Sequence, residues 1–322
     1  MPSKAPHADL EHPPSFVREV VGLTERDVLA KVYRVFEERL LVLSESPEMS
    51  EHIECFMRNL EMEFTEPTIR VALLSADGAG AGRKIQLCCP ELDIARTERL
   101  GYDAWLAFRR LFMRLALDPS RPNYIMHASA VADEKGRAAL VVGVSDSGKT
   151  SALIGLVREG LRMVCDDYSA MTFDEGRVVS LPVGVTVTER TFEWFPALRE
   201  LARPTCQFMH RRQRQWTVNL SERFEVCPAF EEFEPTHFYF LFPNFGSGSS
   251  IDECDREWSQ WWFQAGRILS HNMTPRFVSS ALSYHEKCFA LVQKMVGRAK
   301  FFKVMNGDIH ETTSLIADSF RG

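Results

Sequence analysis

The sequence predicts an α/β fold with α+β elements. A mixed β-sheet carries a glycine-rich loop, with an N-terminal α+β region before it and a mostly helical C-terminal region after it. The apolar run 138–142 has the length and composition of a buried strand, and segment 151–159 has apolar residues at helical spacing. Between them lies Gly143–Thr150, with the sequence G-V-S-D-S-G-K-T. A strand, a glycine-rich turn and a helix in this order are typical of a strand–helix–strand unit with parallel strands.

The glycine-rich turn has the complete G-x-x-x-x-G-K-S/T pattern of a phosphate-binding loop, or P-loop. In such a loop the backbone N–H groups and the dipole of the following helix converge on one point, where a polyphosphate can bind. We expect Lys149 to reach the β- and γ-phosphates of a nucleotide and the Thr150 hydroxyl to hold Mg²⁺. The residues expected to bind the nucleotide are Gly143, Val144, Ser145, Asp146, Ser147, Gly148, Lys149, Thr150 and Ser151.

An aspartate pair follows the next predicted strand. The helix ends near Gly160, and residues 161–165 predict a short strand that leads directly into Asp166 and Asp167. Because ligands in such sheets bind beyond the carboxyl ends of the strands, the pair should lie beside the P-loop. One carboxylate can then hold Mg²⁺ while the other takes a proton from an attacking hydroxyl. We interpret the preceding Cys165 as a small core residue.

The composition is that of an ordinary globular protein. The chain has 322 residues, of which 45% are hydrophobic and 25% charged, and its net charge is −6. The acidic balance argues against a nucleic-acid partner, and no apolar run reaches the roughly 18 to 20 residues of a membrane span. Residues 1–15 lack the apolar core of a secretion signal, and we expect a disordered lead-in there. The scattered cysteines, without a C-x-x-C pair, are typical of reduced thiols in a cytoplasmic protein.

Residues 16–120 predict an α+β region ahead of the P-loop. Segment 32–44 fits either a strand pair or a helix that begins near Thr24, and the pattern does not decide between them. A peptide substrate would need a groove in which to bind, and we expect this region to provide it and so to recognise the substrate. A helix is predicted at 47–64, then two strands at 68–75 and 84–89 around the turn 77–82, and then a second helix at 97–117.

Residues 121–322 predict the P-loop domain and its C-terminal helical elaboration. A strand at 124–131 and a hairpin at 169–181 flank the strand–helix–strand unit and indicate a mixed sheet. Near the C-terminus the patterns predict helices at 257–270, 279–296 and after Asp308, and a strand at 301–305. The basic cluster 210–214 is interpreted as a solvated face; its functional alternative is an anchor for phosphates or an acidic substrate.

Segment 124–187 resembles the kinase domain of HPr kinase/phosphorylase and its relatives, a nucleotide-binding core that ATP-dependent phosphoenolpyruvate carboxykinases share. The resemblance covers about a fifth of the chain. The matching features are His127 at the start of a strand, a second strand leading into the P-loop, a helix ending in Gly160, and the aspartate pair.

The resemblance implies ATP and Mg²⁺ as cofactors, with Lys149 and Thr150 binding phosphate and metal. It also implies that Asp166 is the base that activates the acceptor hydroxyl. Asp167 would support the metal or the geometry, and His127 would lie close to the catalytic carboxylate and the phosphate. Without the resemblance, His127 could equally be an ordinary histidine at a strand end.

The sequence departs from the family pattern at three places, and these departures limit the activities that we expect from the resemblance. Asp146 stands in the loop where a small or neutral residue is usual, and Thr150-Ser151 replaces the Ser-Glu of the bifunctional enzymes. Residues 184–192 read G-V-T-V-T-E-R-T-F instead of the signature of the phosphorylase reaction. We therefore expect no phosphorylase activity. The better match is the broad set of HPr-kinase-like proteins, some of which phosphorylate a serine of a ribosomally made peptide.

Together the residues and the resemblance predict an ATP-dependent kinase that transfers the γ-phosphoryl group to a hydroxyl, most simply a serine of a peptide or protein partner. Two alternatives stay open. A small-metabolite P-loop kinase would usually start near the loop, whereas about 140 residues precede it here. A non-catalytic ATP-binding partner of a biosynthetic complex would not need the intact set of site residues. The resemblance also implies a homo-oligomer, and the tryptophan-rich segment 257–270 could form its interface.

Overall fold

A computed structural model describes residues 29–63, 65–76, 83–116, 123–210, 212–244, 248–266 and 278–322. The predicted lead-in 1–15, the turn 77–82, and residues 267–270 of an expected helix lie outside these ranges. Contacts divide the chain into two compact units. The first consists of Met1–Glu54 and Glu61–Phe112, and the second of Cys55–Leu60 and Met113–Gly322.

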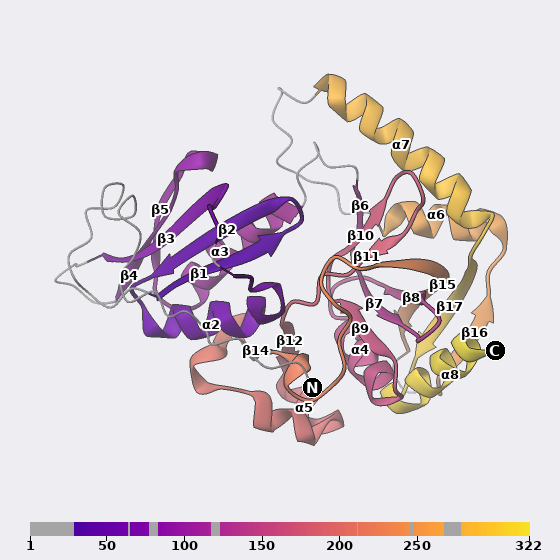
Figure 1. The fold of residues 1–322 in the computed structure, drawn as a ribbon. Helices are drawn as coiled ribbons and strands as arrows, with labels where there is room; N and C mark the ends of the chain where they lie inside the picture. Colours follow the sequence, from indigo (N-terminus) through magenta and orange to yellow (C-terminus); the bar gives the residue numbers. More distant parts are fainter. Residues whose placement is uncertain are drawn as a thin grey trace. The chain divides into compact units, whose positions relative to one another are not determined.

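The first unit contains a β-sheet with helices packed beside it (Figure 1). In its described residues the sheet has five strands in chain order: β1 (Leu29–Val35), β2 (Glu38–Ser44), β3 (Ile69–Ala76), β4 (Lys84–Cys89) and β5 (Ile94–Arg99). Strands β2 and β3 are parallel, and the other neighbours are antiparallel. Its helices are α2 (Pro47–Met57), whose last three residues belong to the second unit, and α3 (Tyr102–Ala116), whose last four residues belong to the second unit. His52 of α2 stacks on Trp105 of α3, with ring centroids 3.8 Å apart.

The structure decides one open alternative in the sequence predictions for this part of the chain and corrects the bounds of two predicted helices. Segment 32–44 is a strand pair, because β1 and β2 pair along their whole length from Leu29–Ser44 to Val35–Glu38. Helix α3 begins at Tyr102 and not at residue 97, since Thr97 pairs with Gln86 in the ladder of β4 and β5. The helix predicted at 47–64 ends at Met57 and continues only as a short 3₁₀ turn. In the second case sheet pairing overrides a helical pattern.

The second unit is built on a mixed sheet that has nine strands within the described residues. Its main path is β6 (Asn123–Met126), β10 (Ser169–Thr172), β11 (Val178–Val179), β15 (Glu232–Pro243), β8 (Arg137–Val142), β7 (Ala128–Ala132) and β9 (Arg162–Cys165). Strand β17 (Lys300–Asn306) pairs with β15, and β16 (Ser250–Glu253) pairs with β17. The predicted parallel strands β8 and β9 share this sheet, with β7 antiparallel to both between them.

Strand β15, which the sequence analysis did not predict, lies in the interior of this sheet. It runs parallel to β8 on one side and to β17 on the other. Its alternate side chains face opposite layers, as the two-residue repeat of a strand requires. On one face His237 contacts Phe320, and the Tyr239 hydroxyl donates to the Ile316 carbonyl; both partners lie on α8 (Ile309–Arg321). On the other face Phe238, Phe240 and Phe242 contact aromatic rings of α6 (Arg256–Ala265).

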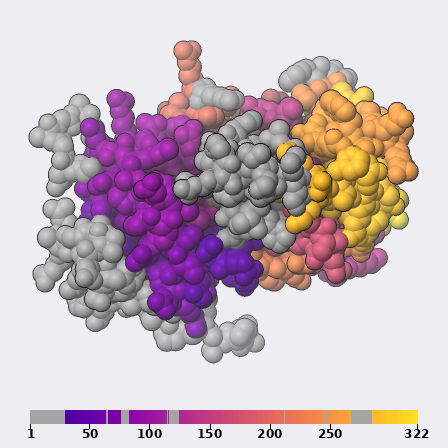
Figure 2. Space-filling model, turned by 90° about the horizontal axis from the view of Figure 1, so that it is seen from above, coloured from indigo at the N-terminus to yellow at the C-terminus, as the bar shows by residue number. Residues whose placement is uncertain are grey.

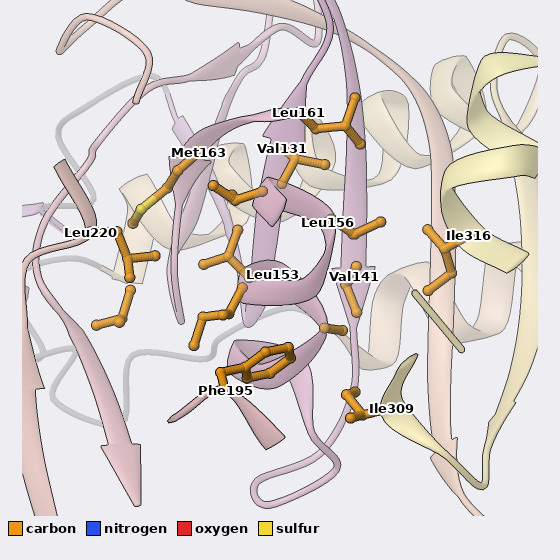
Figure 3. Close-up of a cluster of buried hydrophobic side chains, with 14 of the residues drawn as sticks. Val131, Val141, Leu153, Leu156, Leu161, Met163, Phe195, Leu220, Ile309 and Ile316 are labelled. Carbon is orange, nitrogen blue, oxygen red and sulfur yellow. The ribbon is translucent and has the colours of Figure 1, made fainter. Parts of the chain in front are cut away.

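The main hydrophobic core surrounds α4 (Lys149–Arg158), the helix that follows the P-loop (Figure 3). Leu153 and Leu156 of α4 pack with Val141 of β8 and Ile316 of α8 in this cluster. A smaller antiparallel sheet joins the same core through Val185, Val187, Trp216 and Val218. In the described residues its strands are β12 (Val185–Thr188), β14 (Gln213–Val218) and β13 (Gln207–His210), and α5 (Glu189–Trp194) follows β12. Helix α4 is therefore held from several sides.

Helices α6 and α7 (Val278–Val296) pack against each other and leave apolar rings at the surface. Figure 2 shows this part of the second unit in orange and golden yellow. Trp261 is 62% exposed and Phe289 57% exposed, whereas Phe263 is buried against β15 and β17. Across the described part of the chain, no helix is both long and apolar enough to cross a bilayer.

A short segment early in the chain belongs to the second unit. The backbone N–H of Gly184 donates to the Phe56 carbonyl at 2.7 Å, and the Asn59 amide donates to the Pro182 carbonyl at 2.7 Å. Arg58 also forms an ion pair with Glu222 at 2.7 Å. A truncation that removes residues 1–120 would therefore remove part of the second unit as well, so experiments on this protein require the full chain.

His237 makes the second unit sensitive to acid. Burial, with a smaller contribution from the charges of Lys300 and Arg137, lowers the pKa of His237 to about 4. The unfolded chain takes up this proton near pH 6.5, so stability is lost as the pH falls from about 6.5 to about 4. His237→Phe keeps an aromatic ring at this position, but the phenyl ring cannot bind a proton. The free energy of unfolding of the variant in urea, minus that of the wild type, should therefore increase as the pH is lowered from 7 to 4.5.

The His285→Phe variant, at an exposed position, is the matched control for replacing a histidine with a phenylalanine. Equal pH dependence of wild type and His237→Phe would contradict the role assigned to His237.

Candidate functional site

The P-loop connects β8 to α4 and is shaped by two glycines. Gly148 has φ +99° and stands directly before the first residue of α4, Lys149. A Cβ on Gly143 would lie 2.5 Å from Ser147 Oγ and 3.0 Å from the Leu241 carbonyl oxygen, so only glycine fits there without movement. The loop is therefore tightly folded, and the N-terminus of α4 directly follows it, where a bound anion would contact the helix.

Lys149 lies back across the loop. Its ammonium group donates a hydrogen bond to the Val144 carbonyl at 3.0 Å, and the residue is only 5% exposed. Burial lowers the pKa of Lys149, while the nearby charges of Asp167, Asp166 and Asp146 oppose this shift. A buried ammonium close to several carboxylates is a positive charge that an anionic ligand at the loop would meet directly.

Asp166 lies at the end of β9 and is held by two hydroxyls. Ser129 of β7 donates to Oδ1 at 2.5 Å, and Thr150 of α4 donates to Oδ2 at 3.0 Å. The residue is 4% exposed. Burial, followed by the charge of Asp167, raises the pKa of Asp166 to about 6, although both hydroxyl hydrogen bonds act in the opposite direction. The carboxylate is thus fixed against the P-loop threonine, as the sequence predicted for a residue at this strand end.

Asp167 occupies a different environment from its neighbour. Its backbone has φ +61°, in the left-handed region that aspartate tolerates better than most residues. Its carboxylate lies 3.6 Å from His127 Nε2, and the side chains of Asp167 and His127 are 29% and 35% exposed. The His127 ring is also near Tyr168, with centroids 6.5 Å apart. Two of the predicted site residues therefore meet at a partly exposed edge.

His127 stands at a break in the sheet. The strand expected at 124–131 is divided there into β6 and β7, and the His127 backbone N–H donates to the Gly266 carbonyl at 2.8 Å. This hydrogen bond lies outside the strand ladders, and the His127 side chain lies 3.6 Å from the Asp167 carboxylate. The predicted strand 124–131 would have placed His127 in its interior, whereas the resemblance implied a histidine at a strand start; in the structure His127 lies directly before β7.

The remaining predicted loop residues divide into exposed and buried groups. Val144 is 62% exposed, and Asp146, exposed as well, has φ +65°. Ser147 and Ser151 are buried, at 3% and 6% exposure. The Ser147 hydroxyl is buried without a hydrogen-bond partner in the described structure. Ser151 lies inside the first turn of α4, so its side chain is part of the helix packing.

Two residues that the sequence analysis did not single out complete the site. Ser129 holds Asp166, and the Asn306 amide donates to the Ser147 carbonyl of the P-loop at 3.1 Å. The basic cluster 210–214 lies at the turn between β13 and β14, where His210 pairs with Gln213 and Arg212 has φ +68°. The role of this cluster as an anion anchor stays a hypothesis.

The donor set fits a magnesium-bound nucleotide. The Thr150 hydroxyl and the Asp166 carboxylate are hard oxygen donors 3.0 Å apart, and Mg²⁺ at phosphates usually takes only one or two protein ligands. Consistent with this, the described residues hold no cluster of three or more His, Cys, Asp or Glu that would bind a metal unaided. The orphan Ser147 hydroxyl and the two constrained glycines add a polar cradle for phosphate oxygens.

Comparison with known proteins does not assign the chain to a family. No protein-family model and no curated protein matches the sequence. Among solved structures, the HPr(Ser) kinase/phosphatase from Coxiella burnetii is similar at 11% sequence identity and a TM-score of 0.28. That alignment covers 61% of this chain and 93% of the other. The predicted mixed α/β class itself is confirmed by the strand order and pairing of the two units.

The hydrogen bond from Ser129 holds down the pKa of Asp166. Ser129→Ala should therefore raise that pKa above its value of about 6, because burial and the Asp167 charge would act with less opposition. Carboxyl-carbon NMR titration of the metal-free protein measures the shift.

Ser169→Ala is the matched control. Ser169 is equally buried, but its hydroxyl donates to the Ala128 carbonyl and not to Asp166. An Asp166 pKa that is unchanged or lowered in Ser129→Ala would show that this hydrogen bond does not control the carboxylate.

Proposed function

We propose that this protein is an ATP-dependent kinase that transfers the γ-phosphoryl group to a hydroxyl, with a serine of a peptide or protein as the acceptor. The observation that carries the proposal is the 3.0 Å contact between the Thr150 hydroxyl of the P-loop and the carboxylate of Asp166. A second carboxylate, Asp167, is adjacent to this contact and more accessible. Phosphoryl transfer needs this combination of a phosphate cradle, a metal-holding pair and a proton acceptor.

ATP and Mg²⁺, when bound, supply the transferable phosphoryl group and a divalent charge that neutralises it. The N–H groups of the loop and the N-terminus of α4 would hold the phosphates. Lys149 would exchange its hydrogen bond with the Val144 carbonyl for one with phosphate oxygens. Thr150 and Asp166 would hold the metal. The chain's contribution is thus positioning and charge neutralisation.

We assign the role of general base to Asp167, which exchanges the roles that the family resemblance implied for the two aspartates. A base must come within hydrogen-bond distance of the hydroxyl whose proton it takes. Asp166 is nearly inaccessible and both of its oxygens already accept hydrogen bonds, whereas the Asp167 side chain is 29% exposed. As the acceptor oxygen bonds to the γ-phosphorus and the bond to the β-phosphate oxygen breaks, the proton passes to the Asp167 carboxylate. His127, 3.6 Å away, would stabilise the charge and orientation of Asp167.

The place where the acceptor binds and the partners of the protein are further parts of this proposal. The edge formed by His127, Asp167 and Tyr168 is where an acceptor hydroxyl would approach, and residues 16–120 would recognise the rest of a peptide or protein. We retain the forward kinase reaction alone, because the phosphorylase signature has no counterpart at 184–192. A cytoplasmic protein without nucleic-acid or membrane partners, assembled as a homo-oligomer, is the setting that we propose for this activity.

Asp167→Asn should abolish phosphoryl transfer while leaving Mg²⁺·ATP affinity within about threefold of wild type, because the variant lacks only the proton acceptor. Asp166→Asn should instead weaken Mg²⁺·ATP binding by about tenfold or more, because it removes a carboxylate from the metal side. Calorimetric titration with ATP measures binding. Incubation with γ-labelled ATP, Mg²⁺ and the peptide and protein products encoded beside the gene measures transfer.

The outcomes separate the alternatives. Label on a serine of one neighbouring product, absent with Asp167→Asn, supports the peptide or protein kinase. Transfer to a small molecule only would favour the metabolite kinase, and ATP binding without transfer to any acceptor would favour a non-catalytic partner. Normal transfer by Asp167→Asn, with loss in Asp166→Asn at saturating ATP, would return the base role to Asp166.

A further inference from the structure

Three parallel strands direct their carboxyl ends to the edge of the sheet that carries the P-loop. In the registers of β15 with β8 and β17, Phe240 is opposite Val142 and Pro243 is opposite Asn306. The strands β8, β15 and β17 therefore present their carboxyl ends at one edge, where ligands of such sheets bind. The P-loop follows the first strand, Asn244 follows the second, and Asn306 is the last residue of the third.

Asn306 reaches the P-loop directly. Its side-chain amide donates to the Ser147 carbonyl at 3.1 Å. The same nitrogen is the neighbour of Gly148: a Cβ at that glycine would lie 2.8 Å from it. Gly148 is thus constrained twice, by φ +99° and by the closeness of Asn306.

This contact also orients a phosphate donor. The Ser147 carbonyl and the Gly148 N–H belong to one peptide group, and in a planar trans peptide these two bonds point in opposite directions. When Asn306 holds the carbonyl on its own side, the Gly148 N–H must point to the other side of the peptide. P-loops bind phosphates with such backbone N–H groups.

Asn306 is itself fixed from the C-terminal helix. The Thr312 hydroxyl of α8 donates to Asn306 Oδ1 at 3.0 Å, which leaves the Nδ2 group to face the loop. Thr312 is fully buried and its hydroxyl lies 2.8 Å from the Ser249 hydroxyl. Ser249 in turn accepts from the backbone N–H groups of Gly307 and Asp308, so the turn between β17 and α8 is tied to the same point.

We propose that Asn306 is a positioning residue for nucleotide binding: it sets the Ser147–Gly148 peptide so that the Gly148 N–H faces the phosphates. The inference rests on the proposed function, since it concerns the same P-loop, but it assigns a role to a residue far along the chain that carries no motif. Because the amide acts through the loop and does not touch the reacting atoms, its loss should weaken phosphate binding more than it weakens the fold.

The test compares two Asn→Asp substitutions at the same sheet edge in the full-length protein. Asn306→Asp keeps an acceptor for Thr312 but replaces the donor that faces the Ser147 carbonyl with an oxygen. Asn244→Asp adds the same charge at a residue whose backbone N–H donates to the Asn306 carbonyl at 2.9 Å and whose amide donates to Gly248 and not to the P-loop. Asn306→Ala removes the donor without adding charge.

We expect Asn306→Asp to weaken Mg²⁺·ATP binding by about tenfold or more and Asn306→Ala by about threefold to tenfold, from the loss of one hydrogen bond with or without a repelling oxygen. Asn244→Asp should stay within about twofold to threefold of wild type, because only the added charge acts. Calorimetry measures binding, and thermal unfolding without ligand should give Asn306→Asp a Tm within about 3 °C of wild type.

Each other outcome overturns the inference in a recognisable way. Affinities of both Asn306 variants equal to wild type would show that the contact does not position the loop. Equal weakening by Asn306→Asp and Asn244→Asp, with Asn306→Ala unchanged, would reduce the effect to charge. Weakening accompanied by a large fall in Tm of both Asn306 variants would make Asn306 a purely structural residue. Failure of wild type to bind Mg²⁺·ATP would instead reject the proposed function, and this inference with it.

Discussion

The parallel pairing of β15 between β8 and β17 is the constraint on which the second unit depends. It places the ends of three strands at one edge, where the P-loop and Asn306 meet. It also separates the two layers, since alternate residues of β15 face α8 on one side and α6 on the other. A register shift of one residue would exchange the two faces and bury the wrong side chains. The same pairing therefore specifies both the core and the site.

Within the site, the environment gives two adjacent aspartates different chemical properties. Asp166 follows β9 and is buried; burial and the neighbouring charge raise its pKa to about 6, and two hydroxyls hold its oxygens. The left-handed backbone of Asp167 turns the next carboxylate back toward the partly exposed His127. Strained backbone of this kind is often found at functional sites because the surrounding structure must maintain it. A single turn thus separates a buried carboxylate from a partly exposed one.

Local patterns made much of this predictable from the sequence. The P-loop, the helix after it and the strand before Asp166 are contiguous, so their periodicity and turn residues were sufficient. Strand β15 was missed although F-Y-F-L-F is apolar, because a run buried on both faces lacks the alternation that identifies a strand. Ser129 and Asn306 carry no motif and reach the site only through sheet register. The different exposure of the two aspartates is equally a tertiary property, and for that reason the resemblance could suggest the pair but not decide their roles.

The connection through Asn306 has a thermodynamic consequence for the whole second unit. The loop conformation that presents the Gly148 N–H requires β17 to be paired with β15 and α8 to supply Thr312. Suppose a ligand binds only this conformation. The free energy by which the packing of β17 and α8 favours ligand binding then equals the free energy by which the bound ligand stabilises that packing. Gly155 strengthens the coupling, because its missing side chain lets Thr313 of α8 approach α4 closely. In the proposed function, the last two elements of the chain, β17 and α8, are therefore part of the nucleotide site in energetic terms, although they lie about 150 residues after the P-loop in the sequence.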